Sequence, residues 1–281
     1  GGFASDELAI SYLERSYAGD NVDLVLHHEM VHWYDSRLGG DLRPSILVEG
    51  LAVYLSGGHF KPEPLLPRAA ALPELGWYLP LQALADDFYR SQHETGYLQA
   101  GALVAYMVDR WGWEDFMAFY RDIHPLNGSG SQALAMERAL QNYFDLSLAE
   151  LDEDFRLFLG QQVYTPAQRE DVRLTVLFYD TLRRYQQALD PSAYFLTAWL
   201  PDTVAVREQG ITADYLRRPE QAANLALELA LVEANRLLLE GDYPGTQALL
   251  DGINASLAVL APQVQLPLPG EPPTGESPGG K

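Results

Sequence analysis

The stretch that decides how this chain folds is Leu26-His27-His28-Glu29-Met30-Val31-His32-Trp33, close to its N-terminal end. Within it, His28 and His32 are four residues apart, a spacing that places both side chains on one face of a helix, with Cβ atoms about 5–6 Å apart. Two imidazoles so placed can bind one metal ion at Zn–N distances of about 2.0–2.1 Å. Glu29, one step round the helix, would lie beside the metal, where it can accept a proton from a bound water. The stretch therefore predicts a helical metal site with its own base.

The residues around this motif favour a helix over about 20–38. Asp20 or Asn21 can cap its N-terminus, and Asp23 would lie near the positive end of the helix dipole. Apolar residues recur at helical spacing, as expected for a helix that packs on a core. These residues are Leu24, Val25, Met30 and Val31.

Two histidines do not complete a catalytic zinc site, which usually has three protein ligands and an open position for water. Glu49 is the candidate third ligand, in Ser45-Ile46-Leu47-Val48-Glu49-Gly50-Leu51-Ala52-Val53-Tyr54. A glutamate among so many apolar residues would be costly to bury unpaired, and a metal removes that cost. The alternative is a surface glutamate on the helix expected over 44–57. Gly39, Gly40 and Pro44 predict the turn that returns this helix alongside the first.

The order His28-Glu29-x-x-His32 followed by Glu49-Gly50-Leu51-Ala52-x-Tyr54 resembles the gluzincin clan of zinc metallopeptidases. That clan includes the thermolysin-like and leucyl-aminopeptidase-like families, and the chain looks most similar to the bacterial peptidase MA-like proteins. A further match begins at Tyr97-Leu98-Gln99-Ala100-Gly101 and resembles the aminopeptidase segment in which a tyrosine supports the oxyanion. The resemblance covers roughly residues 1–160.

The resemblance implies a zinc-dependent peptidase that acts on a peptide or protein substrate. Zn2+ would be held by His28, His32 and Glu49, with Glu29 as general base and then general acid, and Tyr97 as oxyanion donor. The chain departs from the clan because almost no β-sheet precedes the first histidine. It also lacks the aminopeptidase segment Gly-Ala-Met-Glu-Asn, so recognition of a free N-terminus is not carried over, and endopeptidase and exopeptidase action both stay open.

The composition is that of a folded, acidic protein without disulfides. Of its 281 residues, 47% are hydrophobic, and the formal net charge is −20. Such acidity disfavours nucleic acid or an anionic membrane as partner, since both attract basic patches. The chain has no cysteine, which excludes thiolate ligands and a cysteine nucleophile. No apolar run is long enough to span a bilayer.

The chain begins Gly1-Gly2 rather than with Met, which suggests processing or trimming, so that upstream residues such as a signal peptide would lie outside it. A secreted or cell-envelope location goes with that interpretation, and the sequence leaves both location and oligomeric state open.

The expected fold class is mainly α: the C-terminal helical part of a zincin-like catalytic domain with little or no β-sheet, followed by an α-helical bundle or hairpin domain. The domains expected are 1–165, catalytic, 166–262, helical, and 263–281, a flexible tail rich in proline and glycine. Residues 8–12 suggest one strand, and the proline-rich run 57–80 suggests a long loop at the cleft entrance. The further helices expected span about 81–87, 96–110, 114–123, 131–143, 147–162, 168–189, 192–199, 213–217, 219–240 and 244–260.

Three other residues near the motif have both a structural and a functional interpretation. His27 faces about 100° away from His28 and is expected to be packed or solvent-facing. Asp35 could orient an imidazole of the site or be an exposed acid in the last turn. His93 could line a substrate pocket or be a loop residue without a role.

The sequence also allows three alternatives to a peptidase. The first is a catalytically silent protein of zincin fold that binds partners through its acidic surface or its C-terminal helices. The second is a helical scaffold in which the motif is accidental, and it predicts no bound metal. The third, a di-iron carboxylate site, is weak because it needs a second Glu-x-x-His pattern.

Overall fold

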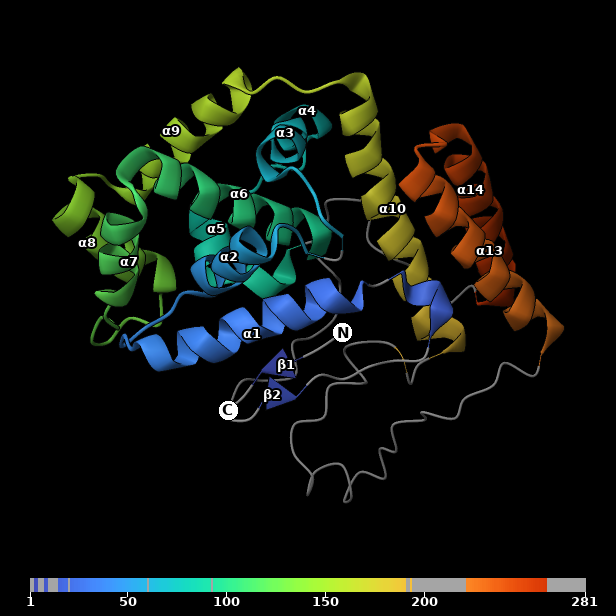
Figure 1. Cartoon of the computed structure of the whole chain (residues 1–281), viewed down its shortest axis with the longest axis horizontal. Helices are drawn as coiled ribbons and strands as arrows, with labels where there is room; N and C mark the ends of the chain where they lie inside the picture. Colours follow the sequence, from blue (N-terminus) through green and yellow to red (C-terminus); the bar gives the residue numbers. More distant parts are fainter. Residues whose placement is uncertain are drawn as a thin grey trace, which may run out of the picture. The chain divides into compact units, whose positions relative to one another are not determined.

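The structure of the protein, a computed structural model, describes residues 3–4, 8–9, 15–19, 21–59, 61–91, 93–190, 193 and 221–261. Within these ranges the chain is mainly helical, which confirms the expected fold class (Figure 1). The strands in this part of the chain are β1, Phe3–Ala4, and β2, Leu8–Ala9. They pair antiparallel, with Phe3 opposite Ala9 and Ala4 opposite Leu8. Among the residues described ahead of the first long helix, these two short strands are the only β-structure.

The described residues divide into two compact units. The N-terminal unit comprises 3–4, 8–9, 21–59, 61–91 and 93–172, and the C-terminal unit comprises 15–19, 173–190, 193 and 221–261. The division lies at 172/173, inside a long helix, whereas the boundary expected from the sequence is at Thr165-Pro166.

The helices of the N-terminal unit are α1 Val22–Leu38, α2 Ser45–Ser56, α3 Leu65–Ala69, α4 Ala71–Leu75, α5 Leu81–Asp86, α6 His93–Trp111, α7 Trp113–Arg121, α8 Gln132–Phe144, α9 Leu148–Gln161 and the first part of α10 Pro166–Leu189, with the 3-10 turn η2 Phe88–Arg90. Those of the C-terminal unit are the rest of α10, α13 Ala222–Glu240, α14 Tyr243–Leu260 and the 3-10 turn η1 Ser16–Ala18.

Helices α2 and α6 form the centre of the N-terminal unit and pack closely along each other (Figure 1). Glycines make this approach possible. A Cβ on Gly50 of α2 would lie 2.5 Å from the carbonyl oxygen of Ala100, and one on Gly101 of α6 would lie 2.5 Å from Cγ1 of Val53. Since both distances are far below van der Waals contact, the close crossing depends on these two positions having no side chain.

Capping side chains and a glycine define several helix ends, and the first is a cap expected from the sequence. Asn21 caps α1, with its Oδ1 accepting a hydrogen bond from the Leu24 amide at 3.1 Å. Ser147 and Glu150 form a capping box at the start of α9. In the hairpin of α13 and α14, Gly241 ends the first helix with φ 78°, and Asp242 caps the second. This left-handed position is one that glycine occupies without strain.

The expectation of a long loop over 57–80 is wrong for part of that run, because α3 and α4 lie within it. Pro67 and Pro73 each stand at the third position of their helix. The first amides of a helix have no partner within the helix, so a proline there removes no hydrogen bond. Pro67 and Pro73, which suggested a loop, therefore lie at positions where a short helix tolerates proline.

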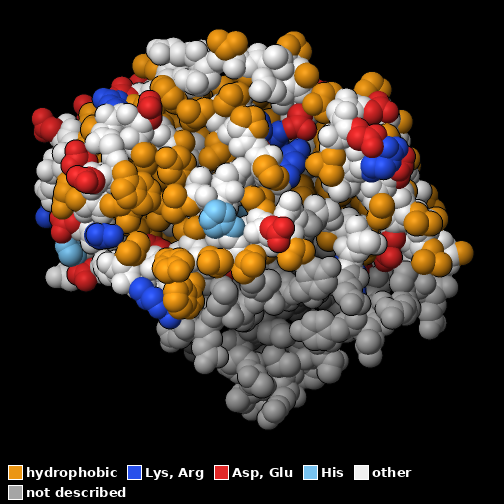
Figure 2. Space-filling model, viewed as in Figure 1, with side chains coloured by type: hydrophobic (Ala, Val, Ile, Leu, Met, Phe, Trp, Pro, Cys, Tyr) orange, Lys and Arg blue, Asp and Glu red, His pale blue; other side chains and the backbone are white. Residues whose placement is uncertain are grey.

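None of the helices that the structure describes is both long and apolar enough to cross a membrane. On the face of the molecule drawn in Figure 2, acidic side chains are dispersed among apolar and neutral ones rather than gathered into one patch. The helices expected over 192–199 and 213–217 and the tail 263–281 lie outside the described residues.

Candidate metal centre

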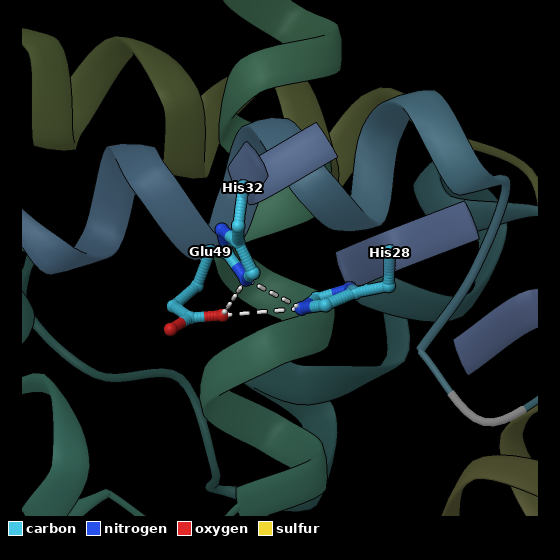
Figure 3. A group of neighbouring side chains, drawn as sticks. All are labelled: His28, His32 and Glu49. Carbon is cyan, nitrogen blue, oxygen red and sulfur yellow. Dashed lines mark hydrogen bonds and ion pairs between the residues drawn. The ribbon is translucent and has the colours of Figure 1, made fainter. Parts of the chain in front are cut away.

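The expected ligands come together from α1 and α2. His28 and His32 lie one turn apart on α1, and Glu49 points at both rings from α2 (Figure 3). The Nε2 atoms of the two histidines are 3.0 Å apart. Oε2 of Glu49 lies 3.3 Å from each of them. Three potential ligand atoms thus form a nearly equilateral triangle.

This triangle fits a zinc ion. With bonds of about 2.0–2.1 Å, two ligands of a tetrahedral zinc site lie about 3.3–3.4 Å apart, close to the observed separations. Two imidazoles and one carboxylate are also a donor set typical of catalytic zinc. Two Nε2 atoms that face each other can share one proton at most, so a cation between them is a natural partner for both lone pairs.

The electrostatics of the three residues are strongly coupled. Burial alone would raise the pKa of Glu49, but hydrogen bonds to His28 and His32 outweigh burial and lower that pKa well below its usual value. Burial alone would lower the pKa of His32, but Glu49 reverses the direction and raises it. The carboxylate of Glu49 is therefore held ionised beside two nitrogen donors, although only 7% of the residue is exposed.

Glu29 lies buried next to these ligands. Its Oε2 has no hydrogen-bond partner among the residues that the structure describes. Burial raises the pKa of its carboxyl group, and the nearby imidazoles of His28 and His32 only partly oppose this. A carboxylate with a raised pKa and an unused oxygen can accept a proton from water more readily than an ordinary glutamate.

Tyr97 is in the fifth position of α6 and borders the site. Its ring centroid lies 6.2 Å from that of His28. The ring stacks on His59 at 3.9 Å and on His93 at 4.4 Å. Burial and the charge of Glu49 raise the pKa of its hydroxyl well above the usual value, so Tyr97 keeps its proton and can act as a donor.

Tyr89 is the site residue that sequence reasoning missed. It belongs to η2, and its hydroxyl donates a hydrogen bond of 2.8 Å to Oε1 of Glu49, the oxygen that does not face the imidazoles. The residue is 65% exposed, so its ring lies at the surface while the hydroxyl reaches inward. No local pattern marks Tyr89, because its place depends on how η2 packs near α2.

The structure also shows where His27, Asp35 and His93 lie. His27 is exposed on α1, as expected. Asp35 is buried, but Oδ2 accepts a hydrogen bond from Tyr120 at 2.9 Å and lies 3.6 Å from Arg43. It therefore pairs with these two residues and is neither exposed nor hydrogen-bonded to an imidazole in the described part of the chain. His93 is the first residue of α6 and not part of a loop.

The arrangement as a whole has the geometry to hold a divalent transition metal, with a carboxylate at Glu29 that could take a proton from water and a hydroxyl at Tyr97 that could donate a hydrogen bond. These abilities rest on the chain's own side chains and their geometry. Comparison with protein-family models, with curated proteins and with solved structures finds no match to this chain.

Proposed function

We propose that this protein is a zinc-dependent peptidase that hydrolyses bonds in peptide or protein substrates. The observation that carries the proposal is the convergence of His28 Nε2, His32 Nε2 and Glu49 Oε2 within 3.0–3.3 Å, beside a buried Glu29. Zinc held by these three residues would polarise a carbonyl group and lower the pKa of water towards about 7.

Glu29 moves the proton in this mechanism. Its carboxylate accepts a proton from the attacking water and then delivers it to the leaving amine, as general base and then general acid. The raised pKa of Glu29 supports both roles. A carboxylate of higher pKa is a stronger base towards water, and its protonated form is still acidic enough to give the proton to an amine.

Tyr97 supports the oxyanion that develops on the scissile carbonyl. Its protonated hydroxyl donates to the oxygen, and its ring is held in place by His59 and His93. Loss of one such donor typically lowers the rate about 10²–10³-fold. Tyr97→Phe is therefore expected to keep the metal and lose activity by that factor.

The test compares zinc content with peptide cleavage in Glu29→Gln. This variant is expected to retain zinc, as measured by mass spectrometry, because Glu29 is not a ligand, and to cleave a peptide library at least about 10³-fold more slowly. Glu114→Gln, an exposed residue in the first turn of α7, is the matched control with unchanged activity. Wild-type turnover by Glu29→Gln would refute the assignment.

The ligand set is tested separately. Glu49→Ala is expected to lose zinc together with activity, because two imidazoles alone hold the ion weakly. Unchanged zinc in Glu49→Ala would show that the third ligand is wrong. A wild-type protein that holds zinc and cleaves no peptide would favour instead a catalytically silent binding protein.

A further inference from the structure

A second group of metal-binding side chains lies outside the triangle of His28, His32 and Glu49. His59, His93 and Glu94 each offer one ligand atom, and these atoms all lie within 4.8 Å of one another. His59 follows the end of α2, whereas His93 and Glu94 open α6. Segments more than thirty residues apart are thus brought together at one point.

The donors of this group match those of the first site. Two imidazoles and one carboxylate suit zinc and other divalent metals of similar softness. Glu94 is only 8% exposed, and its Oε1 lies 3.5 Å from Nδ1 of His93. A buried carboxylate beside two histidines is an environment that favours a cation.

One pair of potential ligand atoms in the second group, Oε1 of Glu94 and Nδ1 of His93, is already close to the spacing that zinc requires. A tetrahedral zinc ion needs ligand separations of about 3.3–3.4 Å, and rotation of the side chains can adjust those of the other atoms, which lie within 4.8 Å of one another. Rotation of His59 and His93 also shifts two rings that stack on Tyr97. This rearrangement, and the repulsion from an ion held beside His28, whose ring centroid is 5.7 Å from that of His59, make the second group the weaker binder.

The two groups are neighbours that share no ligand. The ring centroids of His28 and His59 are 5.7 Å apart. The ring of Tyr97 stacks on His59 and His93, and its centroid lies 6.2 Å from that of His28. Because the two groups have no ligand in common among the described residues, an ion in each would be bound separately, unlike the paired ions about 3.5–4 Å apart in two-metal active sites.

From this arrangement we propose that His59, His93 and Glu94 form a second, weaker binding site for a divalent transition metal next to the first. The inference goes beyond the proposed peptidase activity, because it concerns residues to which that activity assigns no chemical step.

The test is a zinc titration of the full chain after removal of metal, in competition with a chromophoric chelator. The wild type is expected to bind two equivalents, the second with a dissociation constant at least about 10-fold higher than the first. The double variant His59→Asn/His93→Asn is expected to bind one equivalent with the affinity of the first site. A wild type that saturates at one equivalent would overturn the proposal.

Two further variants keep the test decisive. Glu94→Gln changes little in shape, and it is expected to weaken the second equivalent at least about 10-fold without changing the first, so it decides the matter if the double variant does not fold. His124→Asn removes an exposed histidine that lies between Asp41 and Asp122. The His124→Asn control is expected to bind two equivalents of zinc. The proposal would be contradicted if His124→Asn lost the second equivalent while Glu94→Gln kept it.

The outcome is independent of the peptidase proposal. A protein that binds two metals and cleaves no peptide would leave the second site standing and remove the proposed function. An active peptidase that binds only one zinc would support the proposed function and overturn the second site.

Discussion

The two carboxylate oxygens of Glu49 have different partners, and this asymmetry would shape the proposed metal centre. Oε2 faces both imidazoles at 3.3 Å, whereas Oε1 accepts the hydrogen bond from Tyr89 at 2.8 Å. A ligand carboxylate with one oxygen engaged elsewhere presents the other alone to a metal. Tyr89 is therefore a positioning residue for the proposed third ligand.

Replacement of Tyr89 by Phe removes this hydrogen bond and keeps the ring. We expect the affinity for zinc to fall roughly 10-fold, since loss of a partner that orients a metal ligand typically costs 10–100-fold. Competition with a chromophoric chelator measures the change. Tyr34→Phe, at an exposed tyrosine of α1, is the matched control and should bind zinc as the wild type does. Equal affinities in the two variants would contradict the positioning role.

The residues of the candidate site differ in how far the sequence could indicate them. His28 and His32 lie four apart on one helix, so their mutual position follows from helix geometry. Glu49 stood out because a carboxylate in an apolar helix needs a partner. Tyr89 and His59 have no such local signal, since each comes from a short segment whose place is set by packing against α2 and α6.

At the level of secondary-structure elements, the crossing of α2 and α6 determines where Glu49 and Tyr97 lie. Gly50 follows Glu49 directly, and the carbonyl oxygen that its Cβ would meet belongs to the backbone of α6. Backbone atoms of a buried helix cannot turn aside as a flexible side chain can. Any side chain at this position must therefore push the two helices apart.

Gly50→Ala is expected to lower the free energy of unfolding by about 1–3 kcal/mol, even though alanine favours a helix over glycine by about 1 kcal/mol. Urea unfolding measures the loss. The same substitution should weaken zinc binding, because Glu49 moves with its helix. Gly160→Ala is the control, at an exposed position of α9 where a Cβ meets nothing within 4 Å, and its stability should be unchanged or slightly higher. A neutral Gly50→Ala would show that the helices adjust without cost.

A cluster of charged residues joins α3 and its preceding loop to α10 in the N-terminal unit. Arg68 pairs with Glu63 at 2.6 Å and also contacts Asp171. Lys61 lies 3.2 Å from Asp171. Burial and the neighbouring Arg68 nevertheless lower the pKa of Lys61 to about 8. The folded protein therefore releases the Lys61 proton at lower pH than the unfolded chain, in which the pKa of lysine is about 10.4.

This difference in the pKa of Lys61 between the folded and unfolded chain predicts that stability rises with pH. Between about pH 8 and pH 10.4 the unfolded chain binds more protons than the folded one, so the free energy of unfolding rises with pH. Lys61→Met removes this contribution. We expect the stability of the wild type relative to Lys61→Met to rise by on the order of 2–3 kcal/mol across that window. Urea unfolding of both proteins at pH 7.5 and at pH 10 measures it, and parallel changes would contradict the lowered pKa.

The elements that the sequence predicted well are those with a long apolar periodicity. Helices α1, α2, α6 and α8 begin and end within a few residues of expectation, since each buries one face over several turns. The short helices α3 and α4 have too few turns to show a period, and their prolines suggested a loop. A one-turn helix can only be recognised once its neighbours are in place.

At the scale of the whole molecule, neither of the two units is one continuous segment of the chain. Residues 15–19 belong to the C-terminal unit, although α1 of the N-terminal unit begins only a few residues later. Their anchor is Asp190, which is fully buried after the end of α10. Its Oδ2 accepts hydrogen bonds from Nε of Arg15 at 2.8 Å and from the hydroxyl of Tyr17. The ring of Tyr17 also packs edge-on against Tyr185, at 5.2 Å between centroids.

This anchor leads to a prediction about how the two units respond to mutation. Asp190→Ala leaves the Arg15 guanidinium without this buried carboxylate, and removal of one partner of a buried ion pair costs about 3–5 kcal/mol. The loss should appear as a lower unfolding temperature and as faster hydrogen exchange at the Ala18 amide, which donates to the carbonyl oxygen of Arg15. Asp190→Asn keeps an acceptor for Tyr17 and should lose less. Because His28, His32 and Glu49 all belong to the N-terminal unit, zinc binding below the unfolding temperature should stay at the wild-type level in both variants. A loss of zinc that accompanies the loss of protection at Ala18 would show instead that the two units fold as one.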